Sequence, residues 1–442
     1  MKALRIVKLV KEEKIFSSFL PTPPVNAFKS FQTLEPTQRK NLLVLFISGL
    51  FFWTSITTLL PTLPAYIEDI GGTIKQVGFV MGCFAIGLLF SRPWIGQLCD
   101  RNSRKLVVLI GTLVGGIAPL GYLLVHSINS LMAIRAFHGI SIAAFSTGFS
   151  ALVVDLSPAK QRGELIGYMS LVVPVGMAIG PALGGYVQES VSYTPLFLVS
   201  ASLGFLSFFL ANLVTEDRSQ TLLPNLLDNE ILPNRSRGFW EILLGPSFLA
   251  LTLIMLLVGI LFGTLASFLP LFIRAIAIDL NAGLFYTAAA ISSFAVRIFV
   301  GKASDRYGRG LFITGSLICY GVSMFLLTVA QTPFWFLVAA TLEGAGGGVL
   351  IPMTIALLSD RSHNNERGKV YAICLGGFDV GIAIAGPILG VLAESIGYRG
   401  MFSLTSYLAF ISLVLFITQS NKNFTHSLRF AIGRGKDLYA LD

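Results

Sequence analysis

The chain has 442 residues, of which 54% are apolar and only 12% are charged, and its mean hydropathy is +0.75. Soluble globular proteins carry about 25% charged residues, so this composition excludes an ordinary soluble domain and indicates a protein that lies in a membrane. The formal net charge of +9 suggests a nucleic-acid partner at first sight, but the positions of the basic residues, described below, explain that charge differently.

Residues 1–40 precede the first long apolar segment and are predicted to form a cytoplasmic N-terminal tail. Within Met1–Leu20, basic residues are interleaved with apolar ones. Such a segment is either a basic helix lying on an anionic membrane leaflet or a solvated tail that enforces orientation. The sequence leaves both readings open.

Twelve apolar segments follow the tail. A bilayer core ~30 Å thick needs ~20 apolar residues for one helical crossing, and lipid leaves helices and closed barrels as the only spanning structures. Because the runs are long, the sequence predicts an all-α membrane protein with twelve transmembrane helices. The predicted spans are 41–66, 75–97, 105–126, 129–153, 164–187, 193–214, 248–273, 280–301, 311–331, 334–358, 369–393 and 400–419.

A polar, proline-containing segment divides the spans into two groups of six. The predicted organisation is an N-terminal bundle at 41–215, a cytoplasmic linker at 216–247, a C-terminal bundle at 248–419 and a cytoplasmic C-terminal tail at 420–442. With both termini in the cytoplasm, 26 lysines and arginines fall on the cytoplasmic side and 3 on the other. This is the positive-inside distribution, so the basic excess reflects topology and no nucleic-acid partner is expected.

The same charged sequence occurs twice, 205 residues apart, each time at the end of an apolar segment. Fixed-period repetition indicates two structurally equivalent bundles, and paired membrane bundles commonly bind and move solutes at their interface. The repeated elements are Gly96, Asp100, Arg101 and Arg104 with Gly301, Asp305, Arg306 and Arg309, followed by Asp155 and Arg162 with Asp360 and Arg367.

Four ionisable residues lie deep in predicted spans: Arg135 and His138 in the fourth, Glu343 in the tenth and Asp379 in the eleventh. A charge at mid-membrane costs at least about 2.5–3.5 kcal/mol, so such residues are rare and usually functional. Glu343 and Asp379 are the candidate proton carriers or cation anchors, and Arg135 is the candidate counter-charge or anion anchor. His138 and Glu343 are also 205 residues apart, which predicts that they face one another. The alternative is that these groups form structural ion pairs.

Two further arginines and the cysteines are interpreted structurally. Arg92 and Arg297 lie about two turns from the cytoplasmic ends of their predicted helices. Their side chains are expected to extend towards the membrane–water interface. The four cysteines have no metal-ligand spacing, so they are expected to be packing residues. No metal site and no cofactor are predicted.

These motifs resemble the major facilitator superfamily over residues 41–419. The repeated G-x-x-x-D-R-x-x-R sequence is the most specific mark of that superfamily. Arg135-x-x-His138-Gly139 resembles the helix-4 arginine motif of its 12-span drug/proton antiporter branch, although His138 replaces the usual glutamine. The helix-5 motif of that branch is matched by Gly176, Gly180, Pro181, Gly184 and Gly185.

The resemblance implies roles for several of these residues. The repeated charges would gate the cytoplasmic side, although their arginines also suffice to fix topology. The helix-5 glycines would seal the two halves against leak, although small residues also serve plain helix packing. The first helix of each half would line a cavity, which makes Trp53 and Phe262 candidate substrate contacts. The first helix carries no acid for proton coupling, unlike that of many relatives.

The combined prediction is a secondary active transporter in the plasma (inner) membrane, acting as a monomer. It would export a small organic solute or drug by alternating access, in exchange for protons. An ion-coupled uptake symporter of the same fold is the alternative, and a receptor or channel-like membrane protein is the alternative from a different class. An enzyme is not expected, because the chain has no nucleotide-binding glycine loop and no recognisable nucleophile–base pair.

Overall fold

The computed structural model of the chain describes residues 34–158, 161–216, 237–363 and 366–441. Within these ranges the secondary structure is helical and no strand occurs. The basic segment Met1–Leu20 and most of the expected linker lie outside the described residues, and so does the side chain of Asp305.

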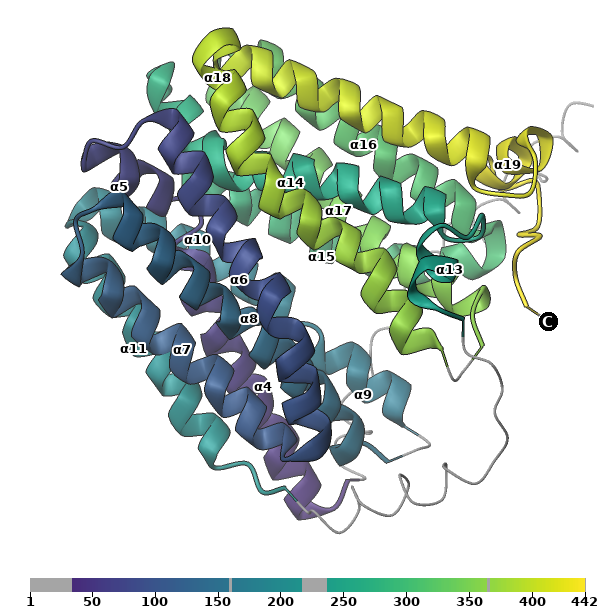
Figure 1. Cartoon of the computed structure of the whole chain (residues 1–442), viewed down its shortest axis with the longest axis horizontal. Helices are drawn as coiled ribbons and strands as arrows, with labels where there is room; N and C mark the ends of the chain where they lie inside the picture. The colour runs from purple at the N-terminus through teal and green to yellow at the C-terminus, as the bar shows by residue number, and fades with distance from the viewer. Residues whose placement is uncertain (1–33, 159–160, 217–236, 364–365, 442) are drawn as a thin grey trace, which may run out of the picture.

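The first half contains six membrane-spanning segments (Figure 1). α4 and α5 follow one another within the first span, and α9 and α10 within the fifth. The helices are α4 (Pro36–Thr58), α5 (Leu63–Asp69), α6 (Ile74–Arg101), α7 (Arg104–Leu124), α8 (Ile128–Leu156), α9 (Arg162–Met169), α10 (Val172–Ser190) and α11 (Tyr193–Asn212).

The second half repeats this arrangement and adds a short helix at each end. Its spanning helices are α14 (Leu249–Ala275), α15 (Ala282–Tyr307), α16 (Arg309–Val329), α17 (Pro333–Asp360) and α18 (Arg367–Gln419). The short helix α13 (Phe239–Leu243) precedes them, and α19 (Phe424–Ala431) follows them. α13 lies in the expected linker and α19 in the expected C-terminal tail.

α18 accounts for two of the predicted spans. Its 53 residues would extend about 80 Å as one straight helix, at 1.5 Å per residue. Gly397 interrupts it with φ 66° and ψ 176°, a conformation that glycine adopts at little cost because it lacks a Cβ atom. The helix turns back on itself in Figure 1. The eleven long apolar helices of the described chain therefore provide twelve crossings, and the predicted all-α membrane fold is confirmed.

The two halves meet at one end of the molecule, which we call the closed end. There Arg274, in the last turn of α14, forms ion pairs with Asp69 at 2.6 Å and Glu68 at 3.2 Å, both in α5. The opposite end carries the repeated charged sequences at the starts of α7 and α16, and we call it the basic end. In Figure 1 the two groups of helices converge near α5 and diverge towards α9 and α13.

Backbone-to-backbone contact joins the halves near the closed end. A Cβ atom added to Gly386 in α18 would collide with the backbone of Gly78 in α6, and one added to Gly283 in α15 would collide with Pro181 in α10. Small residues at such positions let helices approach closely and gain van der Waals contact in a membrane. The repeated Gly-Pro sequences of α10 and α18 therefore lie at the two interfaces between the halves.

This contact predicts opposite effects for two glycine-to-alanine changes in α18. Gly386→Ala forces two backbones apart and should lower the free energy of unfolding by about 1–3 kcal/mol, as overpacking does. Gly376→Ala meets no atom within 4 Å and should leave stability unchanged or raise it by up to about 1 kcal/mol through helix propensity. Detergent unfolding of the purified variants measures both, and equal effects would contradict the interface contact.

Candidate functional site: a cavity between the two halves

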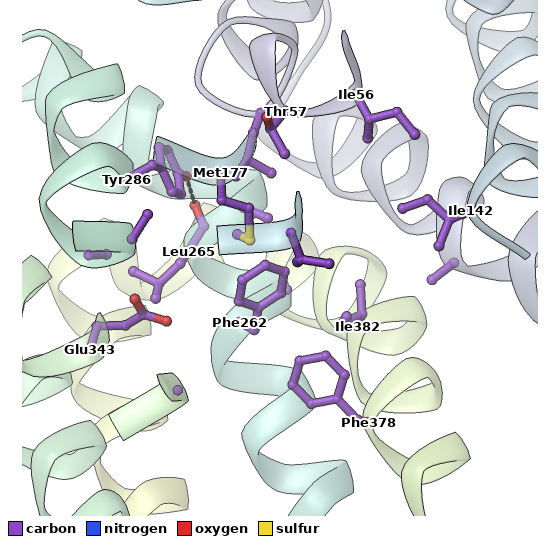
Figure 2. Close-up of a pocket in the computed structure, with 18 of the residues that line it drawn as sticks. Ile56, Thr57, Ile142, Met177, Phe262, Leu265, Tyr286, Glu343, Phe378 and Ile382 are labelled. Carbon is purple, nitrogen blue, oxygen red and sulfur yellow. Dashed lines mark hydrogen bonds between the residues drawn. The ribbon is translucent and has the colours of Figure 1, made fainter. Parts of the chain in front are cut away.

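A cavity of about 370 Å³ lies between the halves and is lined by spanning helices from both. Trp53 of α4 and Phe262 of α14 belong to its wall, where the family resemblance predicted them. Figure 2 shows Phe262 and Phe378 on one side of this space and Ile56 and Ile142 on another. The cavity is thus formed by the pairing of the two bundles rather than within either one.

Most of the wall is aliphatic or aromatic. Met81, Phe84 and Leu88 come from α6, Met177 from α10, and Phe285 from α15. Ligand pockets of about 300–1,000 Å³ with mostly apolar walls and few polar groups bind drug-sized organic molecules. The cavity therefore has the size and chemistry for a lipophilic compound.

Glu343 supplies a carboxyl group to this apolar wall. It lies in the middle of α17, is 9% exposed, and points towards the space beside Phe262 and Leu265 (Figure 2). Tyr286 lies nearby, but its hydroxyl group donates to the carbonyl oxygen of Leu265 at 2.7 Å. Among the described residues, Glu343 forms no hydrogen bond and no ion pair. A buried carboxylate without a partner is costly, so this group favours either a proton or a bound cation.

Asp379 is in a different state, because it already has a partner. Its Oδ2 atom lies 2.8 Å from Nη2 of Arg92, and both residues line the cavity. Arg92 belongs to α6 and Asp379 to α18, so this ion pair crosses between the halves. The expectation that Arg92 extends towards the membrane surface is therefore wrong. Asp379 receives its counter-charge from Arg92 and not from Arg135, which was the expected partner.

Arg135 also lines the cavity, on α8. Its guanidinium group lies 4.3 Å from the ring centroid of Phe84, a cation–π contact. Its Nε and Nη1 atoms are buried and have no hydrogen-bond partner within the described part of the chain. No acidic side chain there forms an ion pair with it. Arg135 therefore remains a candidate anchor for an anionic group.

His138 does not reach the cavity, although the repeat predicted that it faces Glu343. It is fully buried in the first half, and its Nδ1 atom lies 3.0 Å from the hydroxyl group of Tyr122. Its ring also packs edge-on against Phe84. The expectation that His138 and Glu343 face one another is wrong, because Phe84 and Tyr122 enclose the imidazole within its own bundle.

Arg297 is the third arginine of the cavity wall. Its Nε atom donates to the carbonyl oxygen of Gly348 at 3.1 Å, which holds the side chain against α17. Arg297, like Arg92, was expected to extend towards the membrane–water interface, and that expectation is wrong as well. From their positions in the sequence, both arginines were expected to reach water at the end of a helix. Both instead find polar partners inside the molecule, Arg92 in Asp379 and Arg297 in the carbonyl oxygen of Gly348.

The repeated charged sequences form matching ion pairs within each half. Arg104 pairs with Asp155, and Arg309 pairs with Asp360, at equivalent places in the two bundles. Each pair joins the start of one helix to the end of another in the same half. The sequence identified all four residues as repeated elements but did not identify them as partners.

Other predicted residues at the basic end are exposed or form no ion pair among the described residues. Asp100 is exposed and forms no ion pair within the described ranges. Arg306 lies 5.4 Å from the ring centroid of its neighbour Tyr307. Gly96 and Gly163 have open space where a Cβ atom would be. Among the described residues, no ion pair is formed by the remaining members of this set, Arg101, Arg162 and Arg367. No described ion pair joins the charged sequence of one half to that of the other.

Sequence reasoning missed Glu216, which follows α11. Its carboxylate accepts hydrogen bonds from the hydroxyl group of Ser103 and, at 2.8 Å, from the backbone N–H of Arg104. It thus caps the positive N-terminal end of α7. The second half has a comparable tie, because Arg237 forms an ion pair with Glu366 and lowers the pKa of that carboxyl group.

The helix-5 glycines pack mainly within their own half. Cβ atoms at Gly176, Gly180 and Gly184 would collide with Trp53, Thr57 and Thr58 of the first span. Gly185 differs, because a Cβ atom there would collide with Asn281 before α15. The glycines therefore let α10 approach α4 along most of its length, while Pro181 and Gly185 of the same motif meet Gly283 and Asn281 of the other half.

Comparison with known proteins identifies the class of this fold and cavity. A sequence profile described as the Major Facilitator Superfamily matches residues 45–309 and 275–429. A crystal structure of a POT family transporter in complex with thioalcohol conjugated peptide has the same fold, with a TM-score of 0.69 at 13% identity, covering 87% of this chain and 98% of that one. The chain belongs to the Major Facilitator Superfamily and is a multi-pass membrane transporter, not an enzyme.

Two curated relatives are similar over most of their length. Quinolone resistance protein NorA of Staphylococcus aureus (strain MRSA252) is 27% identical over 369 residues, which cover 80% of this chain and 92% of NorA. Multidrug resistance protein MdtG of Escherichia coli O1:K1 / APEC is 26% identical over 383 residues, which cover 83% of this chain and 91% of MdtG. The expected superfamily membership is confirmed, and these relatives support the resemblance to the drug/proton antiporter branch.

The ion pair between Arg92 and Asp379 predicts energetic coupling between the halves. Arg92→Gln and Asp379→Asn each leave one charge unpaired, so the double variant should be more stable than the sum of the two losses implies. The expected coupling is about 0.5–3 kcal/mol, measured by unfolding the four proteins in detergent. Arg92→Gln combined with Glu394→Gln, which alters an exposed acid, should be additive within about 0.3–0.5 kcal/mol. Additivity in both cycles would refute the pair.

Proposed function

We propose that this transporter exports amphipathic organic compounds, cationic ones in particular, in exchange for protons by alternating access. The observation that supports this most directly is Glu343, a carboxyl group in the wall of an apolar cavity that has no partner among the described residues. A proton and an organic cation would compete for this one group. Competition of that kind converts entry of a proton into release of the compound.

The second cavity acid is less suited to the exchange step. The carboxylate of Asp379 is already neutralised by Arg92 at 2.8 Å, so binding a proton there requires breaking an ion pair. We assign coupling to Glu343 and assign Asp379 to the contact between the halves. Arg135 would receive the anionic part of a compound that carries both charges.

The contacts between the halves support the alternating-access part of the proposal. Ion pairs and backbone contacts join the halves at the closed end, whereas the ion pairs of the charged sequences lie within each half. If the termini are cytoplasmic, as the 26 basic residues on that side favour, the cavity opens to the cytoplasm. That is the state in which an exporter loads its compound. A plasma-membrane location and action as a monomer complete the proposal.

The names of the relatives agree with this direction and this substrate class. NorA is named for quinolone resistance and MdtG for multidrug resistance. Resistance by a membrane transporter requires removal of the compound from the cell. An uptake symporter of the same fold is the competing function, and the sign of the proton flux separates the two.

Replacing the unpaired carboxyl group should abolish exchange. In sealed inside-out vesicles with an acidified lumen, a lipophilic cationic dye such as ethidium should alkalinise the lumen through the wild-type protein. Glu343→Gln should remove this response, because its amide cannot carry a proton, while dye binding to the purified variant weakens rather than disappears. Glu394→Gln serves as the control and should behave as wild type. Alkalinisation that survives Glu343→Gln would assign coupling elsewhere, and its absence in the wild type would favour the symporter.

The orientation of the cavity gives a separate prediction. Ser293 lines the cavity on α15, so a Ser293→Cys variant without the native cysteines should react with a membrane-impermeant maleimide from the cytoplasmic side. Labelling in inside-out vesicles should exceed labelling in right-side-out vesicles by at least tenfold, as roughly 1.4 kcal/mol of population bias gives. The same variant carrying Arg274→Gln should label more evenly, because the closed end has lost its ion pairs. Preferential labelling from outside would invert the assigned topology.

A further inference from the structure

The chain beyond the last span folds against the basic end of the second half. We call residues 420–441 the strap. Its anchor is Arg361, whose side chain is 1% exposed and whose Nε and Nη2 atoms lie 2.7 and 3.0 Å from the two carboxylate oxygens of Asp437. Phe430 of α19 is also buried, in the hydrophobic core of the second half. These contacts give the strap a defined position.

One face of α19 is exposed in the part of the chain that the structure describes. Phe424, Leu428 and Ile432 are 58%, 38% and 44% exposed. Residues four apart lie on the same face of a helix, so these three side chains form a continuous apolar stripe. The buried residues Ser427, Phe430 and Ala431 lie on the opposite face and point into the second half.

Basic residues precede, adjoin and follow this stripe along the chain. Lys422, Arg429, Arg434 and Lys436 are exposed, and none forms an ion pair with a described acid. Asp437, the acidic residue in the described part of the strap, is already paired with Arg361. The exposed surface of the strap therefore carries apolar and positively charged side chains together.

The strap lies where a membrane surface must be. α18 is a spanning helix that ends at Gln419, and α19 begins at Phe424. Figure 1 shows α19 folded at that end of α18. Helices at this depth with an apolar face and basic flanks insert the face at the boundary of headgroups and acyl chains, and lysine or arginine near an anionic surface is attracted to it.

We propose that the strap is a binding site for anionic phospholipids. The stripe of Phe424, Leu428 and Ile432 enters the acyl boundary, and the four basic side chains contact the phosphate groups. This site is independent of the compound that the cavity carries and of the coupling ion.

The strap also connects this lipid site to the charged sequence of the second half. Thr314 in α16 donates to the carbonyl oxygen of Ala431 at 2.9 Å, and the N–H of Leu441 donates to the carbonyl oxygen of Asp360 at 2.8 Å. Asp360 is the partner of Arg309. Bound anionic lipid therefore holds the basic end of the second half through the strap.

The test places a fluorescent reporter in the stripe of the full-length protein. Phe424→Trp is reconstituted in nanodiscs of equal phosphatidylglycerol and phosphatidylcholine, with bromine on the acyl chains of one lipid or of the other. The difference from the wild-type protein, which carries its four native tryptophans, isolates the introduced indole. We expect stronger quenching by brominated phosphatidylglycerol. Equal quenching by both lipids would remove the headgroup preference, and no quenching by either would show that water or a protein covers the stripe. Either result overturns the proposal.

Matched charge variants then locate the preference. Arg429→Gln with Arg434→Gln should lower the relative association of phosphatidylglycerol roughly fivefold for each charge removed. Arg39→Gln with Lys40→Gln removes two exposed charges from the basic end of the first half and should leave the preference unchanged. An equal loss in the control would mean that overall charge, not the strap, attracts the lipid, and would also overturn the proposal.

Discussion

The cost of holding an ionised side chain away from water governs this structure. In lipid every charge needs a partner, a path to the surface or a ligand. Arg92 and Asp379 satisfy one another across the two halves, and Arg104 and Asp155 do so within one half. Glu343 is buried and has no partner among the described residues. The fold tolerates it because it faces a cavity between the bundles, where a proton or a ligand can arrive.

The interface between the halves is suited to repeated opening. It relies on close backbone approach, as at Gly78 and Gly386, and on a few polar contacts at one end, such as Arg274 with Asp69. The larger hydrophobic clusters lie mainly inside each bundle, which lets each half move as a unit.

The sequence predicted the spans and the duplication because both depend on local composition and on a fixed offset. Glu343 and Asp379 were recognisable because acids are rare in apolar runs, and Trp53 and Phe262 because family resemblance placed them in the cavity. Side-chain direction was not predictable. His138 turns into its own bundle towards Tyr122, and Arg92 turns inward to Asp379, since both choices depend on neighbours far away in sequence. Glu216 and α19 were missed because each acts only after the chain folds back on a span.

The two halves finish their capping networks at different points along the chain. Glu216 is supplied immediately after α11 and closes the start of α7, so the first bundle contains every residue of its own network once that position is reached. Arg361 must wait for Asp437, which follows 76 residues later in the chain. During ribosomal synthesis, the first half can therefore mature while the second is still being made, whereas the second half matures only after Asp437 has been added. A nascent chain that stalls before Asp437 would expose a buried arginine, and quality-control proteases would have a simple mark by which to recognise it.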